Sequence, residues 1–233
     1  MDLTQKKSII LYFFFILIAV LGILWGNYWV DPYPFLRVWD WTSIIILLIA
    51  LPFLPLQRPA EIPEFWERNL PTRSKIWTPV LIGIGFGILD VIIIKGILHP
   101  QPYSELPPFL QPFPYSLFLY FSGALEIELF YRLIPIVLVL YIFSRIKNGN
   151  YQNQAFWIIA ILTAIREPLE QLPGGEWWFV TYALISGFAM NFLQAIYFKQ
   201  AGFIATLSLR LGHYLIWHIL LGIYVEAWEL SRF

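Results

Sequence analysis

The stretch that decides the fold is SIILYFFFILIAVLGILWGNYWV, residues Ser8–Val30, which holds no charged side chain. A membrane-spanning helix needs about 20 mostly apolar residues, and this run is long enough. Lys6 and Lys7 precede it, as basic residues precede the apolar core of a secretory signal peptide. The run is too long for such a core and lacks a small-x-small cleavage site, so we expect a retained membrane anchor.

Further apolar runs follow the first, and the sequence predicts an all-α fold, a polytopic membrane helix bundle of about seven transmembrane helices. The runs are continuous and do not alternate every second residue, which favours helices over a barrel. The second run is short and could be re-entrant. The six further candidates are Trp41–Leu56, Trp77–Leu98, Tyr115–Phe143, Ala155–Leu172, Trp177–Phe198 and Gly202–Tyr224.

Composition excludes several classes of protein. Hydrophobic residues make up 59% of the chain and charged residues only 13%, which does not fit a water-soluble enzyme or a disordered chain. Lys plus Arg equals Asp plus Glu, at 15 each, so no basic surface for nucleic acid is expected. The absence of cysteine excludes disulfides, thiolate metal sites and a cysteine nucleophile.

The distribution of basic residues between the loops indicates on which side of the membrane the N-terminus lies. With the N-terminus inside, nine Lys and Arg residues fall on the inner side and only Arg37 and Arg232 on the outer side. The sequence therefore predicts a multi-pass integral membrane protein with a cytoplasmic N-terminus and, for seven spans, an outer C-terminus. The nine inner residues are Lys6, Lys7, Arg58, Arg68, Arg73, Lys75, Arg145, Lys147 and Lys199.

Ionisable side chains occur deep inside three of the predicted spans, where they are costly and are usually paired or functional. At about 1.5 Å per helical residue, they lie within the hydrocarbon layer. Three deep arginines match three deep glutamates, so we expect these spans to converge on one polar cavity. The residues are Glu126, Glu128 and Arg132 in the fourth span, Arg166 and Glu167 in the fifth, and Arg210, His213 and His218 in the seventh.

Spacing indicates which of these groups share a helix face. Glu128 and Arg132 are four residues apart, so the arginine can orient the carboxylate, whereas Glu126 points about 160° away from Glu128. A polar stripe on the seventh span holds Arg210, His213, Tyr214 and His218. On a regular α-helix, His213 and His218 would be about 140° apart.

These groups could hydrolyse a bond inside the membrane. A carboxylate can act as general base on water, while an imidazole polarises a carbonyl or protonates a leaving amine. Two histidines and one glutamate could instead bind zinc, but the spacing of the histidines differs from that of helical zinc sites, and no cofactor is expected. A buried structural ion pair remains the alternative for Glu128 and Arg132, and hydrogen-bonded interior histidines for His213 and His218.

The segment Ala124–Arg132, ALEIELFYR, resembles the first motif, E-E-x-x-x-R, of the CPBP intramembrane proteases, which process CAAX proteins and bacteriocins. Glu128 and Arg132 match the second Glu and the Arg, while the first Glu falls on Ile127. His213 matches the His of the third motif, H-x-x-x-N, with Trp217 at its Asn position. The helix Phe156–Leu172, which would carry the second motif, F-x-x-x-H, has no histidine.

This resemblance covers about residues 115–220. It implies a CPBP-like helical core, residues 115–233, preceded by N-terminal transmembrane helices and a proline-rich outer loop, residues 1–114. It also implies peptide-bond hydrolysis by water that Glu and His residues activate. The candidate catalytic residues are Glu126, Glu128, His213 and His218, and the residues expected to orient them or line the cavity are Arg132, Arg166, Glu167, Arg210 and Tyr214. The substrate would be a hydrophobic or prenylated peptide in membrane lipid. The alternatives are a catalytically degenerate relative, a non-catalytic scaffold with a membrane protein partner, and a small transporter.

Overall fold

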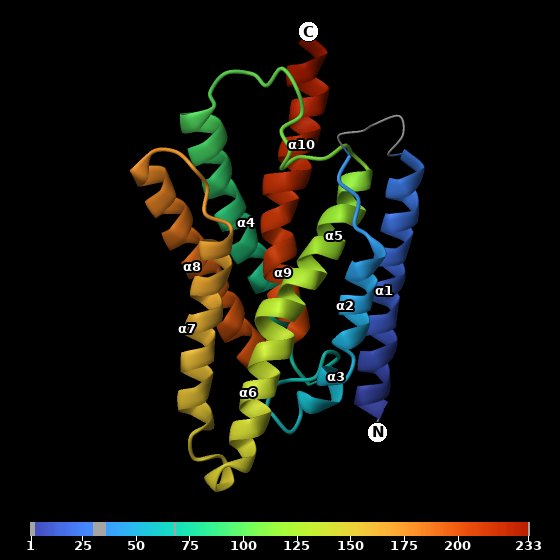
Figure 1. Ribbon diagram of the computed structural model, residues 1–233, viewed down its shortest axis with the longest axis vertical. Helices are drawn as coiled ribbons and strands as arrows, with labels where there is room; N and C mark the ends of the chain where they lie inside the picture. Colours follow the sequence, from blue (N-terminus) through green and yellow to red (C-terminus); the bar gives the residue numbers. More distant parts are fainter. Residues whose placement is uncertain (1–2, 30–35, 68, 233) are drawn as a thin grey trace.

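The computed structural model describes residues 3–29, 36–67 and 69–232, and all regular structure within them is helical. The all-α prediction is therefore confirmed for this part of the chain. Val30, the expected end of the first span, and Arg68, one of the orienting basic residues, lie outside the described residues. In Figure 1 the long helices run side by side, and the N-terminus and the C-terminus lie toward opposite ends of the bundle.

Five of the described helices are long and apolar enough to cross a membrane, which indicates an integral membrane protein. Each carries apolar side chains on its outer surface, where lipid would lie. Their bounds are Leu3–Tyr28, within α1 (Leu3–Trp29); Arg73–Leu98, around α4 (Thr78–Asp90); Tyr115–Arg145, with α5 (Tyr115–Glu128) and α6 (Ile134–Arg145); Trp177–Ala201, which is α8; and Phe203–Glu229, with α9 (Phe203–Tyr214) and α10 (Leu221–Tyr224).

The other two predicted spans are helical but are not among these five. The second is divided into α2 (Trp41–Ile49) and α3 (Phe53–Leu56), because Pro52 cannot continue the hydrogen-bonding pattern of α2. The fifth corresponds to α7 (Gln152–Glu170), whose polar first turn and charged last turns lower its hydropathy. The count of seven spans therefore stays a prediction, as does the inner location of the N-terminus.

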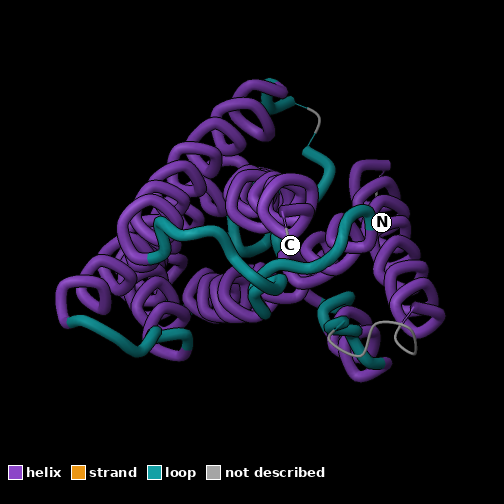
Figure 2. The backbone as a smooth tube through the Cα atoms, turned by 90° about the horizontal axis from the view of Figure 1, so that it is seen from above, coloured by secondary structure: helices purple, strands orange, loops and turns teal. Residues whose placement is uncertain are grey.

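Glycines allow α4 to lie directly against α9, the helix near the middle of the bundle when it is viewed from above (Figure 2). A Cβ at Gly83 would lie 1.9 Å from the carbonyl oxygen of Leu209, and one at Gly212 would lie 2.3 Å from that of Val80. Gly83 and Gly87 form the small-xxx-small spacing of close membrane helix pairs.

Two π-helical turns interrupt the spans that carry the deep polar residues. The turn η3 (Leu129–Leu133) joins α5 to α6 just before Pro135, which lacks the N–H group that a regular helix needs. The turn η5 (Leu215–Leu220) joins α9 to α10. Wider turns of this kind rotate the side chains that follow them and are frequent at functional sites. Further π-helical turns are Arg73–Trp77, Val91–Leu98 and Val225–Glu229, and short 3₁₀ turns are Lys147–Gly149 and Leu230–Arg232.

Candidate functional site

Four buried charges from distant parts of the sequence form one ion-pair network. Glu128 ends α5, Arg132 lies in η3, Glu167 comes from α7 and Arg210 from α9. Arg210 lies between the two carboxylates: its Nε is 2.5 Å from Glu128 Oε1, and its Nη1 and Nη2 are 2.7 and 2.8 Å from the two oxygens of Glu167. The expected convergence of spans four, five and seven is thus present.

Amide and hydroxyl groups complete the network. Gln194 of α8 donates to Glu128 Oε1 at 2.7 Å, and Thr206 of α9 donates to Glu128 Oε2. Arg132 donates to the side-chain oxygens of Asn191 and Gln194, both of α8. The contact predicted from the i,i+4 spacing is longer, with Arg132 Nε 3.9 Å from Glu128 Oε2.

The network is electrically neutral and closed to solvent at its centre. Glu128 and Arg132 are fully buried, and Arg210 is 2% exposed. Two guanidinium groups balance two carboxylates, which is the condition under which charges persist in an apolar interior. Glu128 already accepts hydrogen bonds on both of its oxygens, so its carboxylate is held by protein groups.

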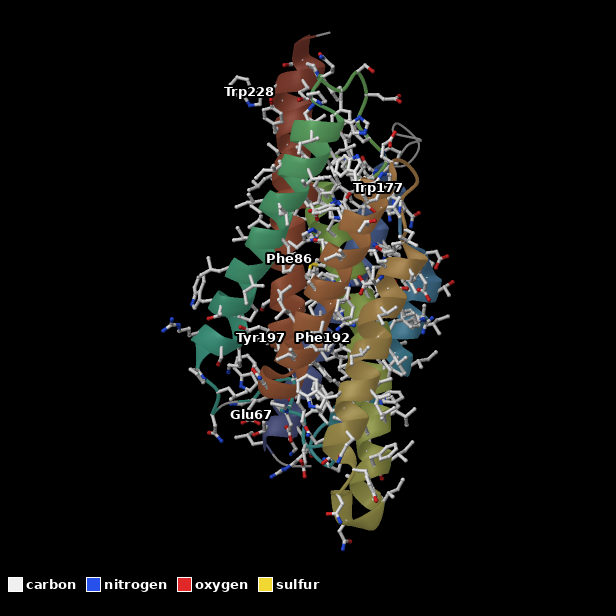
Figure 3. All side chains as sticks on the ribbon, turned by 90° about the vertical axis from the view of Figure 1, so that its left-hand side faces the viewer. Glu67, Phe86, Trp177, Phe192, Tyr197 and Trp228 are labelled. Atoms are coloured by element: carbon white, nitrogen blue, oxygen red, sulfur yellow. The ribbon has the colours of Figure 1, made fainter. Side chains whose placement is uncertain are left out.

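A cavity of about 360 Å³ lies beside this network, between α4, α7, α8 and the α9–η5 helix. Glu167 and Arg210 form part of its wall, as do His213, Tyr214 and His218. Glu128 and Arg132 lie behind this wall and are not among the described lining residues. Figure 3 faces the side on which α4, α8 and α7 stand next to one another, with the cavity-lining Phe86 near mid-height.

His213 is held at the cavity by a carboxylate from another helix. Its Nε2 lies 2.6 Å from Asp90 Oδ2, at the end of α4. The hydroxyl of Tyr182, from α8, donates to the other oxygen of Asp90 at 2.5 Å. Nδ1 of His213 is buried and has no hydrogen-bond partner among the described residues. The close α4–α9 contact at Gly83 and Gly87 brings Asp90 to His213.

His218 is held by a backbone carbonyl. Its Nδ1 lies 2.7 Å from the carbonyl oxygen of Phe109, in the loop between α4 and α5. A carbonyl oxygen only accepts, so Nδ1 carries a hydrogen, and in the neutral imidazole Nε2 then has a free lone pair. The ring of Tyr120 stacks on the imidazole, with centroids 4.1 Å apart and planes 8° from parallel. Both contacts fix the orientation of the ring.

The two imidazoles lie closer than the sequence predicted. Their ring centroids are 6.4 Å apart. The expected separation of about 140° assumed a regular α-helix, but η5 contains more residues per turn and brings residues five apart onto nearly the same face.

Two of the predicted site residues lie elsewhere. Arg166 forms an exposed ion pair with Glu170, with Nε 2.6 Å from Oε1, and Tyr131 donates to the same carboxylate. Glu126 faces away from the network toward Ser43 of α2, as its 160° offset from Glu128 indicated.

Three contributors to the site were not among the predicted site residues. Asp90 is an acidic residue within the third apolar run, and a search for its basic partner in the other runs could have found it. Tyr182 is one tyrosine among 13 and gave no distinguishing pattern. Phe109 contributes a backbone carbonyl, which no side-chain pattern reveals.

Metal binding has no support from side-chain clustering. Within residues 3–29, 36–67 and 69–232, no three His, Asp or Glu side chains are grouped so that they could hold a metal ion. The nearest approach to such a group, Asp90 with His213, already forms a hydrogen bond. His218 is directed to the carbonyl of Phe109.

Comparison with known proteins leaves the geometry as the guide to function. The chain matches no protein-family model, and no curated protein or solved structure is detectably similar to it.

Proposed function

We propose that the protein is an intramembrane hydrolase of CPBP type that cleaves a peptide bond in the cavity. The observation that carries this proposal is the composition of the cavity wall, where two oriented imidazoles lie beside the Arg210–Glu167 pair in an apolar bundle. Imidazoles are the side chains best suited to move protons near neutral pH.

The groups divide into those that can react and those that hold the site together. His218 offers a free Nε2 lone pair and can accept a proton from water. The carboxylates of Glu128 and Glu167 neutralise Arg210 and fix it in the cavity wall, so these three groups hold the site together. In this arrangement Glu128 supports the site electrostatically, and the imidazoles carry out the proton transfers.

The substrate expected from this site is a hydrophobic or prenylated peptide that enters from membrane lipid. Aromatic side chains line much of the cavity, among them Phe86, Phe179, Tyr182 and Trp217. Such walls favour apolar ligands with few polar groups. No role for nucleic acid follows from any part of the site.

The test is cleavage by purified protein in detergent, with hydrophobic and prenylated peptides analysed by mass spectrometry. We expect cleavage by the wild type and its loss in His218→Gln. His99→Gln is the matched control, because His99 is the one other histidine of the chain and lies in the loop after α4. Equal cleavage by His218→Gln and the wild type would refute the proposed role.

The second candidate is a non-catalytic scaffold that assembles with a membrane protein. One observation favours it: Glu128, the acidic residue of the resembling motif, is fully buried and hydrogen-bonded by protein groups. This candidate predicts no cleavage by the wild type and co-purification of one defined membrane partner.

A further inference from the structure

We propose that the two cavity imidazoles hold different protonation states at neutral pH, with His213 as the cation and His218 as the neutral base. Asp90 is then the positioning residue that keeps the proton on His213. The catalytic use of these two protonation states rests on the proposed function. The states themselves belong to the protein without substrate and can be measured in its absence.

Most charged side chains in the interior of the bundle are paired with an opposite charge. The carboxylates of Glu128 and Glu167 are balanced by Arg132 and Arg210. Lys95 is balanced by Glu229, at 2.9 Å. In the part of the chain that the structure describes, these pairs leave the carboxylate of Asp90 without an arginine or lysine.

Among the described residues, His213 is the basic side chain that forms an ion pair with Asp90. Asp90 is partly buried, with 19% of its side chain exposed, and a carboxylate among apolar helices is costly without a counter-charge, which protonation of His213 provides. The two oxygens of Asp90 face His213 Nε2 and the hydroxyl of Tyr182, so both accept hydrogen bonds, as an ionised carboxylate requires.

The surroundings of His218 favour the opposite state. It faces a backbone carbonyl and the ring of Tyr120, and neither supplies a negative charge. A second imidazolium 6.4 Å from the first would add like-charge repulsion in an apolar medium. Two titratable groups whose environments differ in this way are suited to act as an acid and a base.

The groups that face His213 come from every helix around it. They are Asp90 of α4, Tyr182 of α8, Glu167 of α7 across the cavity, Arg210 and Tyr214 of its own helix, and His218 of η5. Arg210 is neutralised by its two carboxylates. Within the described ranges, Asp90 therefore supplies the one negative charge in direct contact with the imidazole.

The ring of His213 lines the cavity, and its Nδ1 is buried without a hydrogen-bond partner among the described residues. A buried nitrogen without a hydrogen bond is rare in native proteins. Protonated Nδ1 is a donor directed at no protein group, and the amide of a bound peptide would supply its partner.

The resulting step is balanced. His218 Nε2 takes a proton from water while the water oxygen bonds to the carbonyl carbon. His213 Nδ1 gives its proton to the amide nitrogen as the C–N bond breaks. One water is consumed, an acid and an amine are released, and a proton returns from His218 to His213 through water in the cavity.

The experiment is ¹⁵N NMR of the full chain in detergent at neutral pH, with ¹⁵N-labelled histidine rings. The chain has three histidines, and His99→Gln assigns the signals of the one outside the cavity. We expect both nitrogens of His213 to be protonated, and His218 to show a protonated Nδ1 with a bare Nε2. A neutral His213 or a cationic His218 in the wild-type spectrum would overturn the proposal.

Asp90→Asn tests the role of the carboxylate. We expect His213 to lose one proton while the signals of His218 stay unchanged, which shows that the fold persists. A cationic His213 in this variant would contradict the assignment. If the variant does not fold, the wild-type spectrum still decides the protonation states. Cleavage assays are scored separately: the expected NMR states without peptide cleavage would refute the hydrolase and leave the protonation states established.

Discussion

Replacing Gly83 with alanine should separate α4 from α9. The new Cβ would lie 1.9 Å from the carbonyl oxygen of Leu209 and 2.8 Å from the amide nitrogen of His213. Ordinary contact begins near 3.4 Å, so the two backbones must move apart by about 1.5 Å. Both neighbouring atoms belong to backbone and cannot turn aside, so the helices must shift.

The cost of this shift can be estimated. Overpacking a close interface costs about 1–3 kcal/mol, which lowers the folding equilibrium constant by a factor of about 5 to 150. Gly85→Ala is the matched control on the same helix, because its Cβ would meet no atom within 4 Å. Alanine there should raise stability by roughly 0.5–1 kcal/mol, because glycine is a poor helix former.

Unfolding by SDS in mixed micelles, followed by circular dichroism, measures both changes. We expect Gly83→Ala to unfold at a lower SDS fraction than the wild type, and Gly85→Ala at the same or a higher fraction. Asp90 lies two helical turns beyond Gly83, so the displaced helix should also weaken the Asp90–His213 hydrogen bond. Equal stability of the two alanine variants would refute the close α4–α9 contact.

Three further predictions concern charges. Glu128→Gln should destabilise the fold by about 3–5 kcal/mol in the same SDS titration, and adding Arg132→Gln should recover part of this loss, because neutrality returns. Arg166→Gln removes an exposed ion pair and should leave the SDS midpoint nearly unchanged; a large shift would place that pair in a buried interface. The hydrogen bond from Thr42 lowers the pKa of the Asp40 carboxyl at the start of α2. Its contribution to stability is present above the unfolded-state pKa and is lost as pH falls through the lowered folded-state pKa. The protection factors of the amides at the start of α2, which are exchange rates corrected for the intrinsic effect of pH, should therefore fall in acid for the wild type and change little for Asp40→Asn.

Much of the site could be predicted because a charged side chain within an apolar span is stable only beside an opposite charge or in a polar cavity. The depths of Glu128, Glu167 and Arg210 already required that they meet, and they do. Helical periodicity also placed Glu126 on the opposite face from Glu128.

The remainder depended on features that side-chain patterns do not encode. The π-helical turn η5 changed the angle between His213 and His218, and no residue type in that segment requires such a turn. Arg210 could have paired with either carboxylate, and its bond to both placed Glu128 behind the cavity wall. The acceptor for His218 is a backbone carbonyl.

The most direct test of the central claim, hydrolysis by the cavity histidines, is incubation with hydrophobic peptides in H₂¹⁸O followed by mass spectrometry of the products. The account predicts one ¹⁸O atom in the new carboxyl terminus for the wild type and for His99→Gln, and no product for His218→Gln. Cleavage that persists in His218→Gln, or a wild type that releases no product from any peptide, would contradict it.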